Sequence, residues 1–274
     1  QIGSSSWVSV TSAWYHAVAI RSDGILFAWG KNDVGQFGNG TTVSRSSPVQ
    51  AIATQINSAL STIIHRSSPV QIGTGSWSLV RASSSHTAAI LSTGALFTWG
   101  NNAFGQLGIS DSITRSSPVQ VGSSSWTSLA TTTSNTYAIR SDGGLFGFGD
   151  NTQGQLGLAE LSISVLTSSW TVVATQPGLT ACTIAIRSDG LLFAWGYNGN
   201  GQFGDNTTVD KSSPVQIGSS SWTAVAIGFS HTAAIRSDGA LFAWGYNLYG
   251  QLGLQDTVAR SSPVQIGSSS WTLV

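Results

Sequence analysis

The stretch "LFAWGYNLYGQLG" at residues 241–253 decides the fold, because the chain repeats it. The other copies are "LFAWGKNDVGQFG" at 26–38, "LFTWGNNAFGQLG" at 96–108, "LFGFGDNTQGQLG" at 145–157 and "LFAWGYNGNGQFG" at 192–204. In every copy the Gln stands seven positions after the Trp, or after Phe148 in the third copy. A constant spacing indicates one local geometry used repeatedly, and a fixed period is the sequence signature of a repeat architecture.

The residues around each copy recur as well. "AIRSDG" precedes four copies and "AILSTG" precedes the remaining one, while "SSPVQIG" or a relative follows most of them. A further tryptophan lies upstream of each copy and once more at the end of the chain: Trp7, Trp77, Trp126, Trp170, Trp222 and Trp271. The intervals between these tryptophans are 70, 49, 44, 52 and 49 residues, so the basic unit has about 49 residues.

One unit contains four short β-type runs. In the last unit these runs are 222–227, 232–236, 241–245 and 263–266. Asp238-Gly239 separates the second run from the third, and this dipeptide predicts a two-residue hairpin turn of the primed type. Pro263 suits the start or the edge of a sheet, because proline cannot donate to the ladder.

Four antiparallel strands in a unit of this length form a blade of a β-propeller. The strands are nearly continuous apolar runs such as "TAAI" and "LFAW", as expected when neighbouring sheets cover both faces of each sheet. The sequence therefore predicts an all-β fold, a β-propeller of four-stranded antiparallel blades with five recognisable repeats in a single domain over 1–274. Five repeats leave open whether the intact ring has six or seven blades or whether the repeats belong to a longer array.

The units "HTAAIRSDGALFAWGYNLYGQLG" and "SSPVQIG" resemble the repeats of the regulator of chromosome condensation family. This resemblance covers nearly the whole chain and fails only at 51–65. It implies a β-propeller, which in this family usually has seven blades. The activity that named the family, nucleotide exchange on a small GTPase together with chromatin binding, is one function that the resemblance implies.

The first interval is 21 residues longer than the unit of 49, because "RSSPVQ" occurs at both 45–50 and 66–71. The intervening segment 51–65 places aliphatic residues on one helical face: Ile52, Ile56, Leu60 and Ile63. We expect a short helical insertion here. The alternative is a sixth blade that has shrunk between two copies of its flanks.

Both ends of the chain carry "QIGSSSW". Residues 271–274 are therefore expected to begin another strand, which either overlaps 1–10 to clasp the ring or continues into a longer array. The chain starts at Gln1 and contains no Met, so we expect a processed or trimmed product.

Composition argues against several classes of function. Charged residues make up 8% of the chain and balance to zero, so the basic footprint of a nucleic-acid-binding protein is absent from the sequence. No apolar run approaches the length of a membrane span, and we expect no membrane insertion. Glu160 is the only Glu, and no nucleophile elbow or Cys-His arrangement occurs. We expect a protein that is not an enzyme and that needs no cofactor.

Antiparallel order places the turn after the first strand and the loop after the third strand at the same end of each blade. We call this the upper end, and the opposite end, with the Ser-Asp-Gly turns, the lower end. Side chains that differ between units at the upper end are the candidate binding residues: Trp14, Tyr15, Lys31, Phe104, Tyr197, Phe229, Tyr246 and Tyr249. A Tyr-rich rim suits a protein or a cell-surface glycan as partner. The alternative is that these rings shield a central channel or pack on their own loops.

Other recurring polar residues have structural explanations. His16, His86 and His231 occupy one equivalent position, where a turn residue bonded to backbone is favoured over a ring of metal ligands. Cys182 takes this position in the fourth repeat and is expected to be a small buried hydrophobe.

Two further sets follow the repeats. One set belongs to the Asp-Gly turns: Asp23, Asp142, Asp189 and Asp238. The other set is expected to hydrogen-bond loop backbone: Gln36, Gln106, Gln155, Gln202 and Gln251.

The sequence thus favours a rigid, non-enzymatic binding or structural module. Repeats rich in "SSPVQIG" resemble those of bacterial surface proteins and of phage tail or fibre proteins, which implies an extracellular, cell-surface or virion location and assembly into a larger particle or fibre. One alternative is a guanine-nucleotide exchange factor or another propeller that binds a GTPase or chromatin. A second alternative is a protein inhibitor of a secreted enzyme, since a bacterial propeller of this type blocks β-lactamases through an aromatic-rich face.

Overall fold

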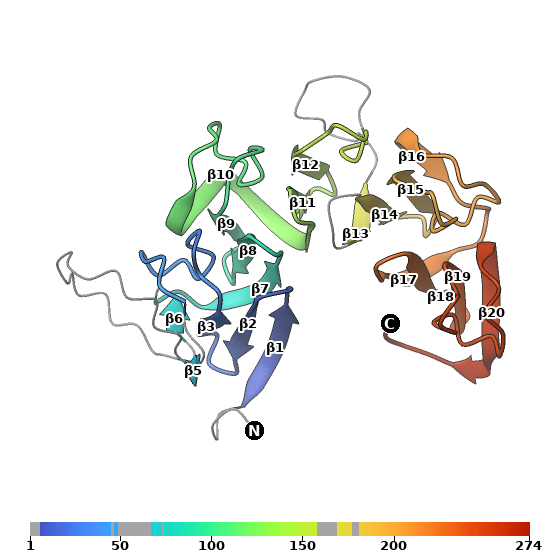
Figure 1. Cartoon of the computed structure of the whole chain (residues 1–274), viewed down its shortest axis with the longest axis horizontal. Helices are drawn as coiled ribbons and strands as arrows, with labels where there is room; N and C mark the ends of the chain where they lie inside the picture. The colour runs from blue at the N-terminus through green and yellow to red at the C-terminus, as the bar shows by residue number, and fades with distance from the viewer. Residues whose placement is uncertain are drawn as a thin grey trace. The chain divides into compact units, whose positions relative to one another are not determined.

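The described part of the chain consists mainly of antiparallel β-strands joined by glycine-rich loops (Figure 1). The structure is a computed structural model, and it describes residues 6–44, 47–48, 67–68, 70–72, 74–157, 169–176 and 181–274. Two compact units divide the chain, residues 1–136 and 137–274.

The first blade of unit 1 is a four-stranded sheet with the order β1-β2-β3-β6. Its strands are β1 (Trp7–Ser12), β2 (His16–Arg21), β3 (Leu26–Gly30) and β6 (Val70–Ile72), and neighbouring strands are antiparallel. The two copies of "RSSPVQ" have different places. The second copy supplies β6, whereas β4 (Ser47–Pro48) from the first copy pairs in parallel with β5 (Ser67–Ser68). The helix expected at 51–65 lies outside the described residues.

The second blade of unit 1 has four consecutive strands. They are β7 (Trp77–Ala82), β8 (His86–Leu91), β9 (Ala95–Gly100) and β10 (Arg115–Thr131). β10 is 17 residues long, and its part from Arg115 to Ser125 pairs with β9 through two shifts of register. This long strand carries the chain from the outer edge of one blade into the next repeat.

Unit 2 begins within β11 (Asn135–Arg140), which is followed by β12 (Leu145–Gly149). Two four-stranded blades follow in chain order. The first consists of β13 (Trp170–Thr175), β14 (Cys182–Arg187), β15 (Leu192–Gly196) and β16 (Lys211–Gln216). The second consists of β17 (Trp222–Ile227), β18 (His231–Arg236), β19 (Ala240–Gly245) and β20 (Arg260–Ser270). The described residues therefore hold four complete blades, which confirms the all-β propeller architecture.

The turn between the second and third strands differs from the prediction. It has three residues, Ser237, Asp238 and Gly239, and the Gly239 amide donates to the Arg236 carbonyl at 2.8 Å. Only Gly239 has positive φ, at 86°, so the predicted primed turn on Asp238-Gly239 is wrong. The Asp238 carboxylate accepts from the Ala240 amide at 3.1 Å and from the Arg236 guanidinium, and these bonds favour a turn closed by a left-handed glycine.

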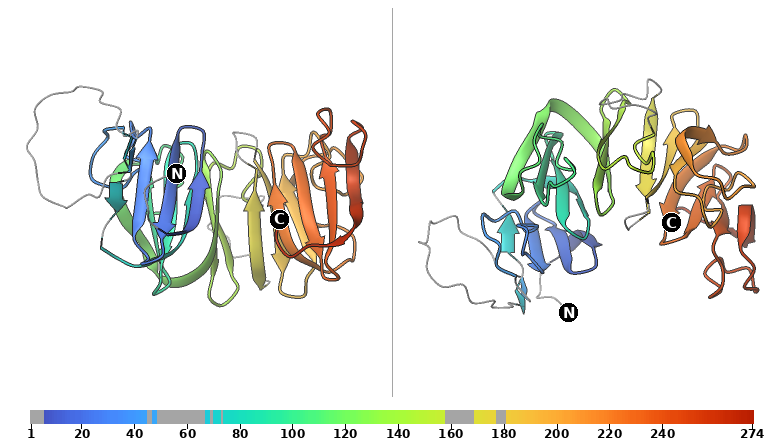
Figure 2. Two further views of the ribbon diagram at one scale, coloured as in Figure 1. Left: turned by 90° about the horizontal axis from the view of Figure 1, so that it is seen from below. Right: turned by 45° about the horizontal axis from the view of Figure 1, so that its top comes forward.

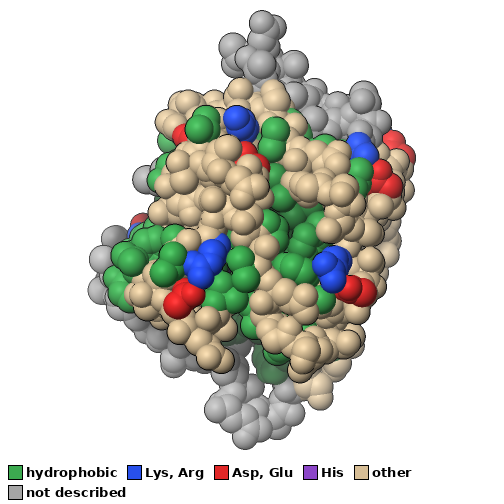
Figure 3. Space-filling view, turned by 90° about the vertical axis from the view of Figure 1, so that its right-hand side faces the viewer, with side chains coloured by type: hydrophobic (Ala, Val, Ile, Leu, Met, Phe, Trp, Pro, Cys, Tyr) green, Lys and Arg blue, Asp and Glu red, His purple; other side chains and the backbone are tan. Residues whose placement is uncertain are grey.

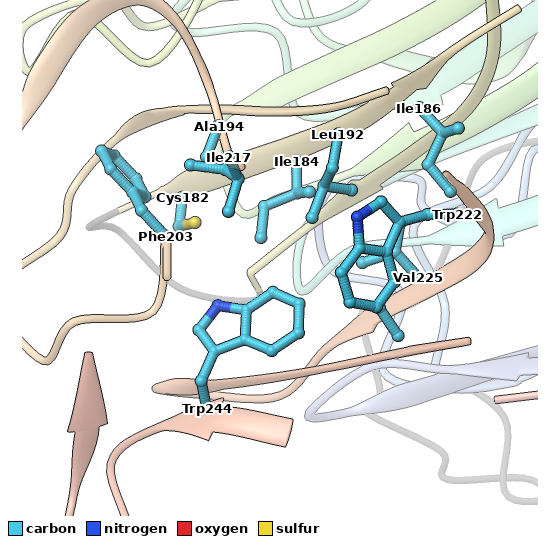
Figure 4. Packing of buried hydrophobic residues seen from close by; sticks show 11 residues of the cluster. Cys182, Ile184, Ile186, Leu192, Ala194, Phe203, Ile217, Trp222, Val225 and Trp244 are labelled. Atoms are coloured by element: carbon cyan, nitrogen blue, oxygen red, sulfur yellow. The ribbon is translucent and has the colours of Figure 1, made fainter. Parts of the chain in front are cut away.

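Successive blades pack face to face through a repeated apolar junction. In unit 1 the first blade contributes Val18, Ile20, Leu26, Ala28, Phe37 and Ile72, and the second contributes Trp77, Val80, Ala89 and Trp99. Figure 4 shows the equivalent junction in unit 2, where Trp222 and Trp244 lie against Ile184 and Leu192. Burying a side chain of this size stabilises the fold by roughly 2–3 kcal/mol, so each junction depends on its two indoles.

The constant spacing of Trp and Gln has its origin in this junction. The Gln202 carbonyl, at the upper end of one blade, accepts a hydrogen bond from Trp244 Nε1 and another from Thr232 Oγ1 of the next blade, each at 2.8 Å. In unit 1 the Gln36 carbonyl accepts from Trp99 and Thr87 in the same way. Trp99, Trp195 and Trp244 each donate in this way to the Gln carbonyl of the previous repeat, whereas the third repeat has Phe148 at the Trp position.

The chain end departs from the sequence expectation. Residues 271–274 form no strand, although we expected one to begin there. The Trp271 amide nevertheless donates to the Gly239 carbonyl at 2.9 Å, as the Trp222 amide does to Gly190 at 2.8 Å. The tail follows the end of β20 (Figure 1). Among the described residues, no helix has the length and apolar character needed to cross a membrane.

Candidate functional site

The two loops at the upper end of each blade lie side by side. The Lys31 amide, after the third strand, donates to the carbonyl of Tyr15, which lies in the turn after the first strand, at 2.8 Å. In the last blade the Tyr246 amide makes the equivalent bond to the Ser230 carbonyl at 2.9 Å. This confirms the prediction that both loops share one end, and Figure 2 (left) shows loops gathered at the two ends of the strands.

An Asn and a Gln fix the backbone of each upper loop, and both are buried in most repeats. In the first blade Asn32 Oδ1 accepts from the Phe37 amide at 2.8 Å, and its Nδ2 donates to the Thr41 carbonyl at 2.9 Å. Gln36 Oε1 accepts from the Val34 amide at 3.0 Å, which confirms that the repeated Gln bonds loop backbone. Because the shared polar groups are used inside the loop, only the variable residues project from it.

In unit 1 three of the predicted residues form one exposed group. Trp14 is 66% exposed and stacks edge-on against Tyr15, with ring centroids 6.3 Å apart. Lys31 Nζ lies 5.2 Å from the centre of the Tyr15 ring and 2.9 Å from the Asp33 carboxylate. A cation over an aromatic face is stabilising, and here it holds Tyr15 upright beside Trp14. Phe104, in the loop of the second blade, is exposed as well.

In unit 2 the predicted residues separate into two kinds. Tyr249 is 87% exposed and contacts the half-buried Tyr246 edge-on at 6.1 Å between ring centroids, and Phe229 is exposed in the neighbouring turn. Tyr197 is different. A Cβ atom on Gly199 would lie 2.2 Å from the Tyr197 hydroxyl oxygen, so this ring covers its own loop. The alternative of packing on a loop therefore holds for Tyr197.

Sequence reasoning missed a set of exposed aliphatic residues in the upper loops. Four of them stand eleven positions after the loop Asn: Val43, Ile113, Val209 and Val258. The carbonyl of Val258 accepts from Asn247 Nδ2 at 3.1 Å, so the loop uses the backbone and leaves the side chain in solvent. Aligning the repeats on the Asn rather than on the Trp would have revealed this position. Leu248, beside Tyr249, is a further exposed apolar residue.

Most charged side chains on the described surface stand in pairs of opposite sign. At the lower end, the Arg and the Asp of one turn form an ion pair in four repeats: Arg21–Asp23, Arg140–Asp142, Arg187–Asp189 and Arg236–Asp238. The Arg140 guanidinium lowers the pKa of Asp142 to about 2. Figure 3 shows one side of the molecule, on which Lys or Arg lies next to Asp or Glu with hydrophobic side chains between the pairs. Paired charges of this kind give the surface little net potential.

His16 and His86 lie inside the junctions between blades, whereas His231 at the equivalent position is partly exposed. His86 is fully buried, with Nδ1 2.7 Å from Ser83 Oγ and Nε2 2.8 Å from Thr136 Oγ1. The hydroxyl partners were not anticipated from the sequence. Burial lowers the pKa of His86 to about 3 and that of His16 to about 4, so both rings are neutral near pH 7. No group of three or more His, Cys, Asp or Glu that could hold a metal occurs in the described part of the chain.

Cys182 occupies the His position in the fourth repeat and is completely buried, as the sequence predicted. Burial raises the pKa of its thiol well above the ordinary value. The Cys182 side chain therefore packs as a small apolar group.

A family profile described as "Regulator of chromosome condensation (RCC1) repeat" matches residues 23–90, 93–138, 189–235 and 238–273. A second profile of the same description matches 7–36, 77–106 and 222–251. The matched residues make up more than half of the chain. The chain belongs to the regulator of chromosome condensation repeat family.

The similar curated proteins are much longer than the matched region. The "Ultraviolet-B receptor UVR8" of Arabidopsis thaliana is 34% identical over 110 residues, which are 40% of this chain and 21% of the receptor. The "Probable E3 ubiquitin-protein ligase HERC4" of Homo sapiens is 29% identical over 104 residues, which are 38% of this chain and 8% of the ligase. The chain thus matches about a fifth or less of the length of these relatives.

Solved structures of RCC1-type propellers share the fold. Human WBSCR16 aligns with a TM-score of 0.76 at 22% identity, covering 96% of this chain and 67% of that protein. Prp20p from Saccharomyces cerevisiae aligns with a TM-score of 0.72 at 18% identity, covering 96% and 66%. At these identities the likeness shows the propeller fold alone. This chain is an RCC1-like propeller module whose upper loops carry its variable exposed side chains.

Proposed function

We propose that the chain is a non-enzymatic propeller that binds a protein through the exposed apolar side chains of its upper loops. This proposal rests on the observation that shared residues in each loop fix the backbone while variable residues are exposed. Shared Asn and Gln side chains hold the backbone, and unlike residues such as Phe104 and Tyr249 project from equivalent places, while Trp14 projects from the turn beside the loop of the first blade. Large aromatic side chains on a rigid frame lose little conformational entropy on binding and are enriched among binding hot spots.

The proposal excludes catalysis by the chain itself. The Asp residues of the lower turns are committed to Arg partners, and His86 and Cys182 are buried inside junctions. Their shifted pKa values follow from structural packing and from fixed ion pairs, as happens in ordinary folds. A binding role uses the upper loops without requiring any of these groups to react.

A protein partner fits the surface better than a nucleic acid, because opposite charges neutralise one another over the described surface and the chain has no net charge. A glycan is the second class of ligand that exposed Tyr and Trp rings accommodate. Display outside a cell or on a virus particle, with assembly into a larger particle or fibre, is part of this proposal. This part rests on the amino-acid composition of the repeats, which is low in charged residues and rich in Ser and Thr.

Two relatives in the fold suggest a rival partner. Prp20p was studied for its binding to Gsp1p and to histones, and the same yeast protein is known bound to Kap60. Transferred to this chain, that would mean a small GTPase, a histone or a transport receptor as partner. A histone needs a complementary acidic surface, and the paired charges here do not provide one.

The test compares two variants of the whole chain. In the first, exposed upper residues are replaced together: Trp14→Ser, Phe104→Ser, Phe229→Ser and Tyr249→Ser. In the matched control, the exposed serines of the lower turns are replaced by alanine: Ser22→Ala, Ser141→Ala, Ser188→Ala and Ser237→Ala. Both variants should keep the far-ultraviolet circular dichroism of the original chain, because all of these positions lie in solvent.

Binding is then measured against immobilised glycans, cell-envelope proteins and a Gsp1-type GTPase loaded with a fluorescent nucleotide. We expect a partner from the first two groups, bound equally by the original chain and the lower-turn control and about a hundredfold more weakly by the upper-loop variant. Release of the nucleotide by the chain would support the rival instead. Equal binding by both variants would remove the upper loops from the proposal.

A further inference from the structure

Arg81 in β7 departs from the pattern of the repeats. Counted from the first Trp of each repeat, its equivalents are all small residues: Thr11, Ala130, Ala174 and Ala226. The residues on either side of Arg81, Val80 and Ala82, are of the usual apolar kind. The second repeat thus carries a long cationic side chain at a position where the fold of the other repeats uses a small one.

Arg81 has no acidic partner in the described part of the chain. Every other arginine that the structure describes forms an ion pair with an aspartate: Arg21, Arg115, Arg140, Arg187, Arg236 and Arg260. The acidic residues described in unit 1 are Asp23, Asp33 and Asp111, and each is paired with a cation other than Arg81. No described carboxylate therefore neutralises the charge of Arg81.

The Arg81 side chain lies on the face of β7 that is turned towards the third repeat. Val80 is fully buried in the apolar cluster that joins the first blade to the second. Successive side chains of a strand point to opposite faces, so Arg81 points away from that cluster. Its equivalent Ala174 packs against the junction with the following blade. In unit 1 the strand on this side is β10, which contacts β7.

This position is partly buried and partly open to solvent. Burial lowers the pKa of Arg81, but a guanidinium remains protonated at neutral pH. A charge that loses hydration without gaining a partner raises the free energy of the folded chain. The side chain is nevertheless partly exposed, so a dissolved anion is able to reach it.

The hydrogen bonds of Arg81 leave one edge of its guanidinium open. Nη1 donates to the Val80 carbonyl at 2.9 Å, whereas Nε and Nη2 have no partner among the described residues. In Arg236 these same two nitrogens donate to the two carboxylate oxygens of Asp238, at 3.0 and 2.6 Å. The open edge of Arg81 is thus the edge with which the chain elsewhere binds a group that has two oxygens.

We propose that Arg81 binds an oxyanion, the carboxylate or phosphate group of a ligand, through Nε and Nη2. Both kinds of group present two oxygens at the spacing of these parallel N–H donors, and hydrogen bonds between charged partners are stronger than neutral ones. The bound anion would neutralise a partly buried charge that the described residues leave without a counterion.

Hydroxyl groups in the adjoining turns are available as further donors. Ser84 lies in the turn after β7 and Thr133 in the turn after β10, and both are partly exposed. The two turns are adjacent, because Ser85 Oγ donates to the Thr133 carbonyl at 3.2 Å. The Ser84 and Thr133 hydroxyls have no partner in the described ranges, and a hydroxyl donates readily to an oxyanion.

The Arg81 site is independent of the exposed apolar side chains of the upper loops. Arg81 lies within a strand, and the variant that replaces Trp14, Phe104, Phe229 and Tyr249 by serine leaves β7 unchanged. We expect that variant to bind the anion as the original chain does. A failure of either proposal would therefore leave the other one standing.

The test measures binding of inorganic phosphate and of succinate by isothermal titration calorimetry, at constant ionic strength and in a buffer without other oxyanions. Arg81→Ala gives the second repeat the residue that three other repeats carry, so we expect this variant to fold. We expect the original chain to bind one anion, and Arg81→Ala to bind it about tenfold more weakly or worse, because a charged hydrogen-bonded pair is lost. Tighter binding of phosphate would indicate a phosphorylated ligand, and tighter binding of succinate a ligand with a carboxylate.

Arg236→Ala is the matched control, because it removes the same charge from a guanidinium that already holds Asp238. We expect its affinity for the anion to equal that of the original chain. Nuclear magnetic resonance of the Arg Nε–H groups locates the site: the resonance missing from Arg81→Ala should shift on addition of anion, and that of Arg236 should not. Binding of neither anion, equal binding by Arg81→Ala, or an equal loss in Arg236→Ala would each overturn the proposal.

Discussion

The hydrogen bonds at the Gln202 carbonyl provide a strong test of how successive blades are joined. This carbonyl belongs to a completely buried residue and accepts from Thr232 Oγ1 and Trp244 Nε1, each at 2.8 Å. Thr232→Val removes the first donor without changing the shape of the side chain, and Trp244→Phe removes the second. Either single change leaves the carbonyl one partner, whereas the double change leaves it none.

The free energies of unfolding should not add. A single lost hydrogen bond costs about 1 kcal/mol, so Thr232→Val should cost about that amount. Trp244→Phe should cost about 2–3 kcal/mol, because it also removes part of a buried ring. In the double variant the buried carbonyl is unsatisfied, which adds about 1–2 kcal/mol beyond the sum of the single changes. The third repeat, which has Phe148 at the Trp position, indicates that the fold tolerates a missing indole.

Urea unfolding followed by circular dichroism gives these free energies, provided that the m-value stays constant across the variants. Thr223→Val is the matched control. Its hydroxyl bonds Ile235 O at 3.3 Å on the surface and shares no partner with Trp244, so its effect should add to that of Trp244→Phe. An additive cycle for Thr232 and Trp244, within about 0.5 kcal/mol, would refute the claim that the two donors serve one carbonyl.

Three further predictions concern the blades. Gly100→Ala should destabilise the chain by roughly 2 kcal/mol more than Gly105→Ala. Both glycines have positive φ, but a Cβ at Gly100 would lie 2.5 Å from a backbone oxygen, whereas a Cβ at Gly105 meets nothing within 4 Å. Equal urea midpoints of the two variants would contradict this prediction. Burial lowers the pKa values of His16 and His86, whereas a His in the unfolded chain protonates near pH 6.5. The free energy of unfolding is therefore highest above that pH and should fall by about 2 kcal/mol per His towards pH 5. The urea midpoint across this range measures the loss, and a midpoint that does not change with pH would contradict the prediction. The Cys182 thiol should react with iodoacetamide only as fast as the chain opens, because it is fully buried, and rapid labelling of the native chain would show that its blade is open.

Much of the fold could be predicted because the same strand and turn pattern recurs in each repeat. The strand at 222–227 was predicted with the bounds that β17 has, and the third strand differed from β19 by one residue. The turn at Asp238 was predicted wrongly because Asp-Gly alone suggests a two-residue loop. The ion pair between Arg236 and the same Asp favours the observed three-residue turn, and it depends on the side-chain geometry of the folded turn.

The sequence predicted the end of the blades at which the candidate site lies, but not which of its side chains are exposed. Antiparallel order was sufficient to place Tyr15 and Lys31 at the same end of a blade. It could not show that Tyr197 covers Gly199 while Tyr249 remains in solvent, because both are Tyr residues in equivalent loops.

The claim that the variable upper-loop residues bind a partner is tested most directly by photo-crosslinking from single positions. A photoreactive phenylalanine replaces Tyr249 in one chain and Ser237, in the lower turn of the same blade, in another. Both are exposed to extract from the organism that makes the protein, with and without an excess of the unlabelled chain. We predict one protein crosslinked from position 249 and not from 237, and competed by the original chain but not by the upper-loop variant. Crosslinks of equal yield from 237, or none from 249, would contradict the account.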